Sequence, residues 1–182
     1  MRSLIVLKFL SLFTVILLFG CAVTEDIISD YDDKIDFNYY ETYVLCLDDF
    51  QVDNTKYTNL DNAFVRQLIG NELDNQMAAL GYKTNVFKPQ LQAGFKISII
   101  EKENIVRNCE FESEFDYWRT CTINTVIYTQ EALIIYVSDI EKNQVIWQAS
   151  IPCELNKSKH ALKKYTKELV DQLFLEYPEI SK

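Results

Sequence analysis

Histidine, glycine and proline are scarce in this chain, and each scarcity limits the structures or sites that it can form. The 182 residues include one histidine, His160, so any Ser/His/Asp, Cys/His or multi-histidine metal site must contain that residue. Four glycines and three prolines leave little room for long flexible linkers. No glycine-rich phosphate-binding motif is present, which disfavours nucleotide binding.

The sequence gives little support to other catalytic or metal sites. Lysines surround His160, and their positive potential disfavours a bound cation, so we expect a solvated residue at a helix start. Cys46 falls within an apolar run, which is typical of an inert core thiol. Asp48–Asp49 and Glu112–Glu114 are neighbouring charges in predicted loops rather than a facing pair for glycoside cleavage. Four acids could offer oxygen ligands to calcium, but the glycine and terminal glutamate of a calcium loop are missing. These acids are Asp30, Asp32, Asp33 and Asp36. We therefore expect no metal, no cofactor and no enzymatic activity.

The first 21 residues resemble an export signal that ends at a lipidation site. Arg2 and Lys8 supply positive charge, Phe9–Phe19 is an apolar run of signal-peptide length, and the small residue Gly20 precedes Cys21. This ending resembles the lipobox of bacterial lipoproteins, in which a peptidase cleaves before a cysteine that carries lipid. We expect residues 1–20 to be a signal peptide and Cys21 to anchor the chain in the cell envelope, at the periplasmic face or the surface of the outer membrane.

Two other interpretations of this segment fit less well. An uncleaved transmembrane helix needs about 20 apolar residues, whereas Leu4–Phe19 is shorter and contains Lys8. An ordinary secretory signal with a different cleavage site would leave Cys21 without a role.

The chain that follows the signal is strongly acidic. Removing Arg2 and Lys8 from the 18 basic residues leaves 16 against 27 acidic residues, a net charge of −11. Nucleic acid is therefore an unsuitable partner, because binding it relies on a cationic surface. Acidic residues concentrate near the start, so we expect an acidic tether over residues 21–35 and a single domain over residues 36–182.

Four cysteines remain once Cys21 is assigned to lipid, and an exported protein can form disulfides. We favour a bridge between Cys109 and Cys121, because they bracket a short polar segment between two strand-like runs. Closing a loop of that size could contribute about 3 kcal/mol. Cys46 and Cys153 fit either a second disulfide or two buried thiols.

Hydrophobic periodicity predicts one strand, a helix, four strands and a second helix. The predicted strands are Tyr39–Leu47, Phe95–Ile99, Thr120–Tyr128, Leu133–Val137 and Val145–Ile151, and the predicted helices are Leu60–Leu80 and Leu162–Phe174. We expect a charged loop at Glu101–Arg119, and short turns at Thr129–Glu131 and Asp139–Asn143 that make the last three strands an antiparallel meander.

These elements predict an α+β fold. The economical arrangement is a single two-layer domain, with a mixed, mostly antiparallel sheet of about five strands and both helices packed on one face. Gly81 is placed to end the first helix, and Gly70 within that helix indicates close packing against the sheet or a bend.

Several segments together resemble a family of exported bacterial lipoproteins, the domain of unknown function 4136. Asp36–Tyr43 is similar to the family's D-F-x-x-Y-x-T-Y pattern, and Leu80–Tyr82 to the pattern that closes its first helix. Leu133–Asp139, followed by Trp147, resembles its L-x-I-x-x-x-D run, and Tyr177 with the next proline matches its aromatic-Pro ending.

The resemblance spans nearly the whole chain after the signal and has two departures. The family tends to open the strand after the first helix with Asp, where this chain has Ala93–Phe95, and the loop that carries Cys109 and Cys121 is particular to this sequence. The resemblance implies an envelope lipoprotein with a two-layer α+β fold, and it supplies no known reaction.

The aromatic loop between Cys109 and Cys121 is the most distinctive candidate contact surface. Aromatic rings beside an arginine are typical of binding hot spots, and the candidate residues are Phe115, Tyr117, Trp118 and Arg119. The alternative is that these rings fold back onto the sheet as a satellite cluster. We expect a non-enzymatic binding or scaffolding module with a protein or glycan partner in the envelope. A structural subunit of an envelope assembly and a carboxylate-based hydrolase are the alternatives.

Replacing the predicted lipidated cysteine tests the membrane anchor. We expect Cys21→Ala to abolish metabolic labelling with palmitate and to leave unprocessed precursor, because the peptidase acts only at a lipid-modified cysteine. Labelling that persists in the variant would contradict the lipobox assignment.

Overall fold

The computed structural model describes residues 27–52, 56–110 and 120–180, with the backbone alone described at 106–110 and 120–123. Six strands form one sheet in the order β1-β6-β5-β4-β2-β3. Their bounds are β1 Ile28–Tyr31, β2 Thr42–Leu45, β3 Lys83–Thr84, β4 Leu91–Glu110, β5 Thr120–Asp139 and β6 Gln144–Cys153. β2 runs parallel to β3 and β4, and the other pairs are antiparallel.

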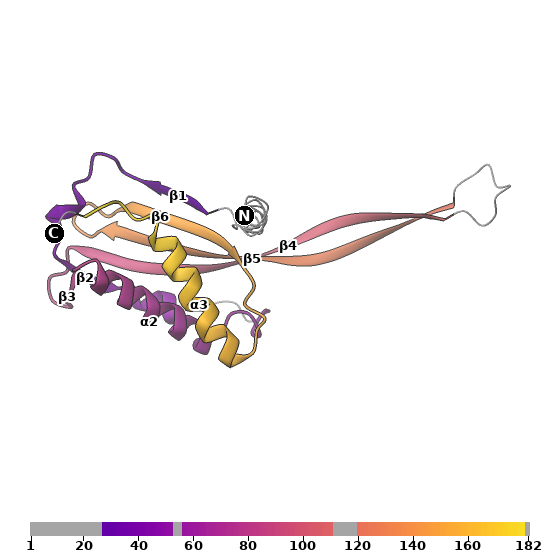
Figure 1. Cartoon of the computed structure of the whole chain (residues 1–182), viewed down its shortest axis with the longest axis horizontal. Coiled ribbons are helices and arrows are strands. Elements are labelled where there is room, and N and C mark those ends of the chain that lie inside the picture. The colour runs from indigo at the N-terminus through magenta and orange to yellow at the C-terminus, as the bar shows by residue number, and fades with distance from the viewer. Residues whose placement is uncertain (1–26, 53–55, 111–119, 181–182) are drawn as a thin grey trace, which may run out of the picture.

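Two helices, α2 (Ala63–Ala79) and α3 (Lys159–Phe174), cover one face of the sheet (Figure 1). The predicted two-layer α+β fold is therefore confirmed, with six strands rather than five. Within the described ranges, no helix is long and apolar enough to cross a membrane.

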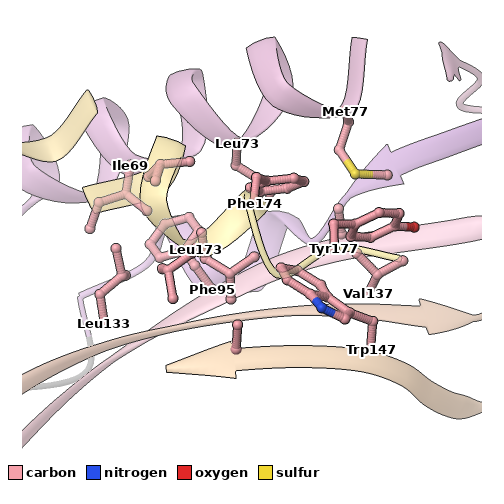
Figure 2. Packing of buried hydrophobic residues seen from close by; sticks show 14 of the residues in the cluster. Ile69, Leu73, Met77, Phe95, Leu133, Val137, Trp147, Leu173, Phe174 and Tyr177 are labelled. Atoms are coloured by element: carbon pink, nitrogen blue, oxygen red, sulfur yellow. The ribbon is translucent and has the colours of Figure 1, made fainter. Parts of the chain in front are cut away.

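The core lies between the helices and the sheet. Figure 2 shows Ile69, Leu73 and Met77 of α2 facing the sheet, where Phe95 and Trp147 are almost fully buried. Side chains at alternate positions of β4 and β5 line this face, as the predicted alternation requires. Burial of these side chains is the main force that holds the two layers together.

Local signals set the helix ends. The Asn62 side chain accepts hydrogen bonds from the backbone N–H groups of Phe64 and Val65, both at 3.1 Å, and so α2 begins three residues later than predicted. Gly81 has φ 89°, a left-handed conformation that favours glycine, and it ends the helix as expected. Gly70 makes the predicted close approach, but its neighbour is the ring of Phe50 in the short 3-10 helix η2 (Leu47–Phe50) rather than the sheet.

The first predicted strand is too long, because its two ends form 3-10 turns. The Asp36 side chain accepts from the backbone N–H of Asn38 at 3.0 Å and starts η1 (Phe37–Tyr39). Only Thr42–Leu45 of the predicted segment is a strand, and η2 follows it. No hydrophobic pattern indicates β1, whose four residues are all exposed, or β3, which has two residues.

The predicted turn at Thr129–Glu131 is wrong, and so is the predicted loop over the first part of Glu101–Arg119. β5 runs without interruption through Thr129–Glu131, and Glu101–Glu110 belongs to β4. Both errors have one cause: polar and charged residues predict a loop, although a strand with solvent on both faces accommodates them. No glycine or proline interrupts either segment.

A buried ion pair joins the helical layer to the sheet. Arg66 donates to both oxygens of Asp61, at 2.6 and 2.7 Å, and its Nη1 donates to the Asp49 carbonyl at 2.6 Å. The Asp49 carboxylate in turn accepts from the Phe95 backbone N–H at 3.0 Å and from the Tyr136 hydroxyl at 2.7 Å. Because Asp61 is 1% exposed, its charge depends on Arg66 for compensation.

Removing one member of this pair should destabilise the fold strongly. We expect Arg66→Met to lower the free energy of unfolding by about 3–5 kcal/mol, because it leaves a buried carboxylate without its cation. Urea denaturation measures the change. Lys56→Met, which breaks the exposed Lys56–Glu101 pair, is the matched control and should have little effect. Equal losses in the two variants would contradict this assignment.

Candidate functional site

The feature that stands apart from the domain is a two-stranded ribbon formed by Ile100–Glu110 of β4 and Thr120–Gln130 of β5. β6 pairs with β5 only as far as Glu131, and β2 pairs with β4 only at Leu91–Ala93. The two strands therefore continue alone, and Figure 1 shows them projecting far beyond the helices. At 3.3 Å per residue the projection is roughly 35 Å long.

The register of β4 with β5 fixes which backbone groups of the ribbon face outward. Near the start of β4, the Ala93 carbonyl accepts from the Cys46 N–H at 2.8 Å, and the Phe95 N–H donates to the Asp49 carboxylate. These two backbone groups of β4 therefore face away from β5. Backbone groups alternate in direction along a strand, and the register has no shift from Leu91 to Glu110. Odd-numbered residues of β4 therefore form non-hydrogen-bonded pairs with odd-numbered residues of β5.

Contacts at the other end of the ladder agree with this assignment. The Ile140 N–H donates to the Gln90 carbonyl at 3.0 Å, as expected for an even-numbered pair. The Asp32 N–H donates to the Ile146 carbonyl at 3.0 Å, on the side of β6 that faces away from β5. In the ribbon, Glu103 and Ile105 thus face outward along one edge and Thr125, Ile127 and Thr129 along the other, and no other strand of the described sheet pairs with these residues.

The ribbon exposes apolar side chains on both faces. Ile105 and Ile127 are each 62% exposed, and Val126 and Tyr128 are each 48% exposed. By the alternation of the strands, the two isoleucines lie on the face that continues the core side of the sheet, and Val126 and Tyr128 lie on the opposite face. Neither face is covered by another described element, so the ribbon presents contact surface on both sides.

The junction of the ribbon with the domain is held by two glutamates. Glu131 is buried and accepts from the Leu155 backbone N–H at 2.6 Å. Glu101 accepts from Lys56 Nζ at 2.7 Å and from the Tyr57 hydroxyl at 2.6 Å. The hydrogen bonds from Lys56 and Tyr57 hold the pKa of Glu101 below its usual range, and the contact with Glu101 raises the pKa of Lys56. These contacts attach the base of the ribbon to the domain.

Some of the predicted site residues lie outside the described part of the chain. Phe115, Tyr117, Trp118 and Arg119 fall within residues 111–119, outside the described ranges, and Cys21 precedes the first described residue. The described backbone brings Cys109 and Cys121 directly opposite each other near the end of the ribbon. Cys46 and Cys153 are not joined to each other, and both are half-buried.

The candidate catalytic residues are placed apart. His160 lies with Lys159, Lys163 and Glu72 along an open groove of about 630 Å³ between α2 and α3. Asp49 is engaged with the sheet, as described above, and Glu112 and Glu114 lie outside the described residues.

Two of the four acidic residues considered for calcium accept hydrogen bonds from the backbone. Asp32 accepts from the Lys34 N–H at 3.0 Å, and Asp36 caps η1. In the described ranges, no group of three or more His, Cys, Asp or Glu side chains is positioned to hold a metal ion.

Aromatic residues from several of the family patterns meet at the end of the domain opposite the ribbon. The hydroxyls of Tyr82 and Tyr177 are 3.2 Å apart, and the Trp147 ring lies 4.8 Å from that of Tyr177 (Figure 2). The Tyr40 hydroxyl donates to Asp139 at 2.7 Å. Burial alone would raise the pKa of Asp139, but hydrogen bonds from the Lys142 N–H, Tyr40 and the Lys142 ammonium hold it below the usual range. These residues are structural.

Comparisons with known proteins agree with the fold. The family model of a domain of unknown function, DUF4136, matches residues 27–179. The structure of a DUF4136 family protein from Bacteroides thetaiotaomicron is similar, with 12% identity and a TM-score of 0.53 over 86% of this chain and 97% of that one.

A PDZ domain protein from Parabacteroides distasonis is also similar, with 13% identity and a TM-score of 0.50 over 87% of this chain. The chain spans only 36% of the length of that protein. At such identities the similarity concerns the fold alone. No curated protein matches the chain.

Proposed function

We propose, from the premise that this chain belongs to the DUF4136 family of domains of unknown function, that it is a lipid-anchored envelope protein that acts by binding rather than by catalysis. The observation that carries the binding role is the ribbon, which exposes Ile105, Val126, Ile127 and Tyr128 to solvent. An isolated pair of strands is only marginally stable in water. A ribbon that extends from its domain with apolar side chains on both faces is therefore suited to a partner that covers it.

The anchor in this proposal is a lipid on Cys21, for which the support is the sequence of residues 1–21. The first strand begins at Ile28, so the intervening chain spans at most about 25 Å. Such a short connection keeps the domain near the membrane surface. The ribbon then extends the reach of the anchored domain toward a protein or glycan of the outer membrane.

A disulfide between Cys109 and Cys121 belongs to the same proposal. They form a non-hydrogen-bonded pair by the register, and the Cα atoms of such pairs lie about 4.5 Å apart. That spacing is within the range that a disulfide requires. The bridge would close the ribbon just below the segment that carries Phe115, Tyr117, Trp118 and Arg119, the predicted contact residues.

Mass spectrometry of protein purified without reductant tests the bridge. We expect a disulfide-linked peptide pair that contains Cys109 and Cys121, while Cys46 and Cys153 react with iodoacetamide after unfolding. Alkylation of all four cysteines before reduction would contradict the bridge.

A photo-crosslinking amino acid placed on the ribbon tests the binding role in intact cells. We expect incorporation at Ile105 to yield crosslinks to another envelope component, because this side chain projects from the ribbon into solvent. Phe87, which is 92% exposed outside the ribbon, is the control position and should yield none of these products. The same products from both positions, or none from Ile105, would contradict the ribbon as the contact surface.

A further inference from the structure

The outer edge of β5 in the ribbon, from Asn124 to Gln130, has the properties of a surface that pairs with another strand. We propose that it pairs antiparallel with the same edge of a second copy of this chain, about a twofold axis through Ile127. The inference rests on the proposed role of the ribbon as a contact surface and names the partner at one of its edges. It concerns this edge alone and leaves the β4 edge and the tip for other partners.

The backbone of this edge is ready to accept a strand. The N–H and C=O groups of Thr125, Ile127 and Thr129 face away from β4, as the register requires. These are the groups that β6 would bind if it were longer, but β6 ends at Cys153, which pairs with Glu131. The open part of the edge therefore begins at Gln130.

The two edges of the ribbon differ in the features that normally block pairing. Exposed strand edges are commonly protected by charged side chains, proline or bulges. The β4 edge has such protection, since Glu101, Lys102 and Glu103 follow one another and Glu101 is held by Lys56. From Asn124 to Gln130, β5 has no charged residue, no proline and no bulge against β4. Its edge is thus the unprotected one.

The side chains of the β5 edge match when the strand is paired with itself. With Ile127 on the axis, Ile127 meets its own copy and Val126 meets Tyr128 of the partner subunit. Thr125 then lies opposite a threonine, and Asn124 opposite a glutamine. Pairs of β-branched with aromatic residues and pairs of threonines are favourable across strands. The sequence is therefore nearly palindromic in residue type about Ile127.

Charge supports a second copy at this edge. The chain has a net charge of −9 at pH 7, so contact between two copies over most of their surface would bring acidic groups together. The uncharged window at Asn124–Gln130 avoids this repulsion. An antiparallel arrangement also places the two domains on opposite sides of the axis.

The test uses a pair of proline variants on opposite edges of the ribbon. Ile127 and Ile105 are each 62% exposed and both direct their N–H outward, so proline at either position leaves the β4–β5 hydrogen bonds in place. Sedimentation equilibrium of the full chain in density-matched detergent measures the dimer dissociation constant. We expect a wild-type dimer, an increase in the constant of about tenfold or more for Ile127→Pro, and a change of less than about twofold for Ile105→Pro.

Amide hydrogen exchange of the wild-type protein supplies a measurement that does not depend on the variants folding. We expect protection at Thr125, Ile127 and Thr129 that increases with protein concentration, and none at Glu103 and Ile105. A monomeric wild type, or equal weakening by the two prolines, would overturn the proposal. If the protein is a monomer but Ile105 still yields crosslinks to another envelope component, only the proposed pairing with a second copy is contradicted. If the protein is a dimer but Ile105 yields no crosslinks to another component, only the proposed binding to an envelope partner is contradicted.

Discussion

The structure depends on one uninterrupted pairing, the antiparallel ladder between β4 and β5. Its register holds from Leu91 to Glu110 without a shift, so one set of hydrogen bonds continues from the core of the domain into the ribbon. In the domain, the ladder is covered by helices and flanked by β2 and β6. Beyond Glu131 the neighbours end, and the same pairing becomes a solvent-exposed ribbon. The alternation that buries Phe95 in the domain therefore exposes Ile105 farther along the same strand.

Buried polar contacts hold the domain end of this ladder in place. Asp49 binds the backbone of β4 and the Tyr136 hydroxyl of β5, while Arg66 connects Asp49 to the helical layer. Burial, with hydrogen bonds to Cys46 and Asp49, raises the pKa of Tyr136, so the hydroxyl stays a donor at any physiological pH. A Cβ at Gly94 would collide with both Asp49 and Tyr136, which explains why this chain has no side chain there. The departure from the family pattern at Ala93–Phe95 thus has a structural role.

The two-layer fold and the helices were predictable because long amphipathic periodicity is a strong signal. Gly81 and the apolar spacing of α2 placed that helix to within a few residues. The alternation of apolar and polar residues along β4 and β5 identified the buried residues of both strands correctly. The ribbon was missed because a strand exposed on both faces lacks the alternation that indicates a half-buried strand. Glu101–Glu103 was therefore interpreted as loop. β1 was missed for the same reason, since all four of its residues are exposed.

The buried aromatic residues of the family patterns and the ribbon lie at opposite ends of the domain. Tyr40, Tyr82, Trp147 and Tyr177 pack or hydrogen-bond within the closed end, and burial raises the pKa of Tyr177 so that it stays neutral. Buried residues of this kind hold the fold together, whereas exposed apolar residues on a projection serve contact. The proposed contact surface therefore uses exposed residues of the ribbon rather than the buried aromatic residues of the family patterns.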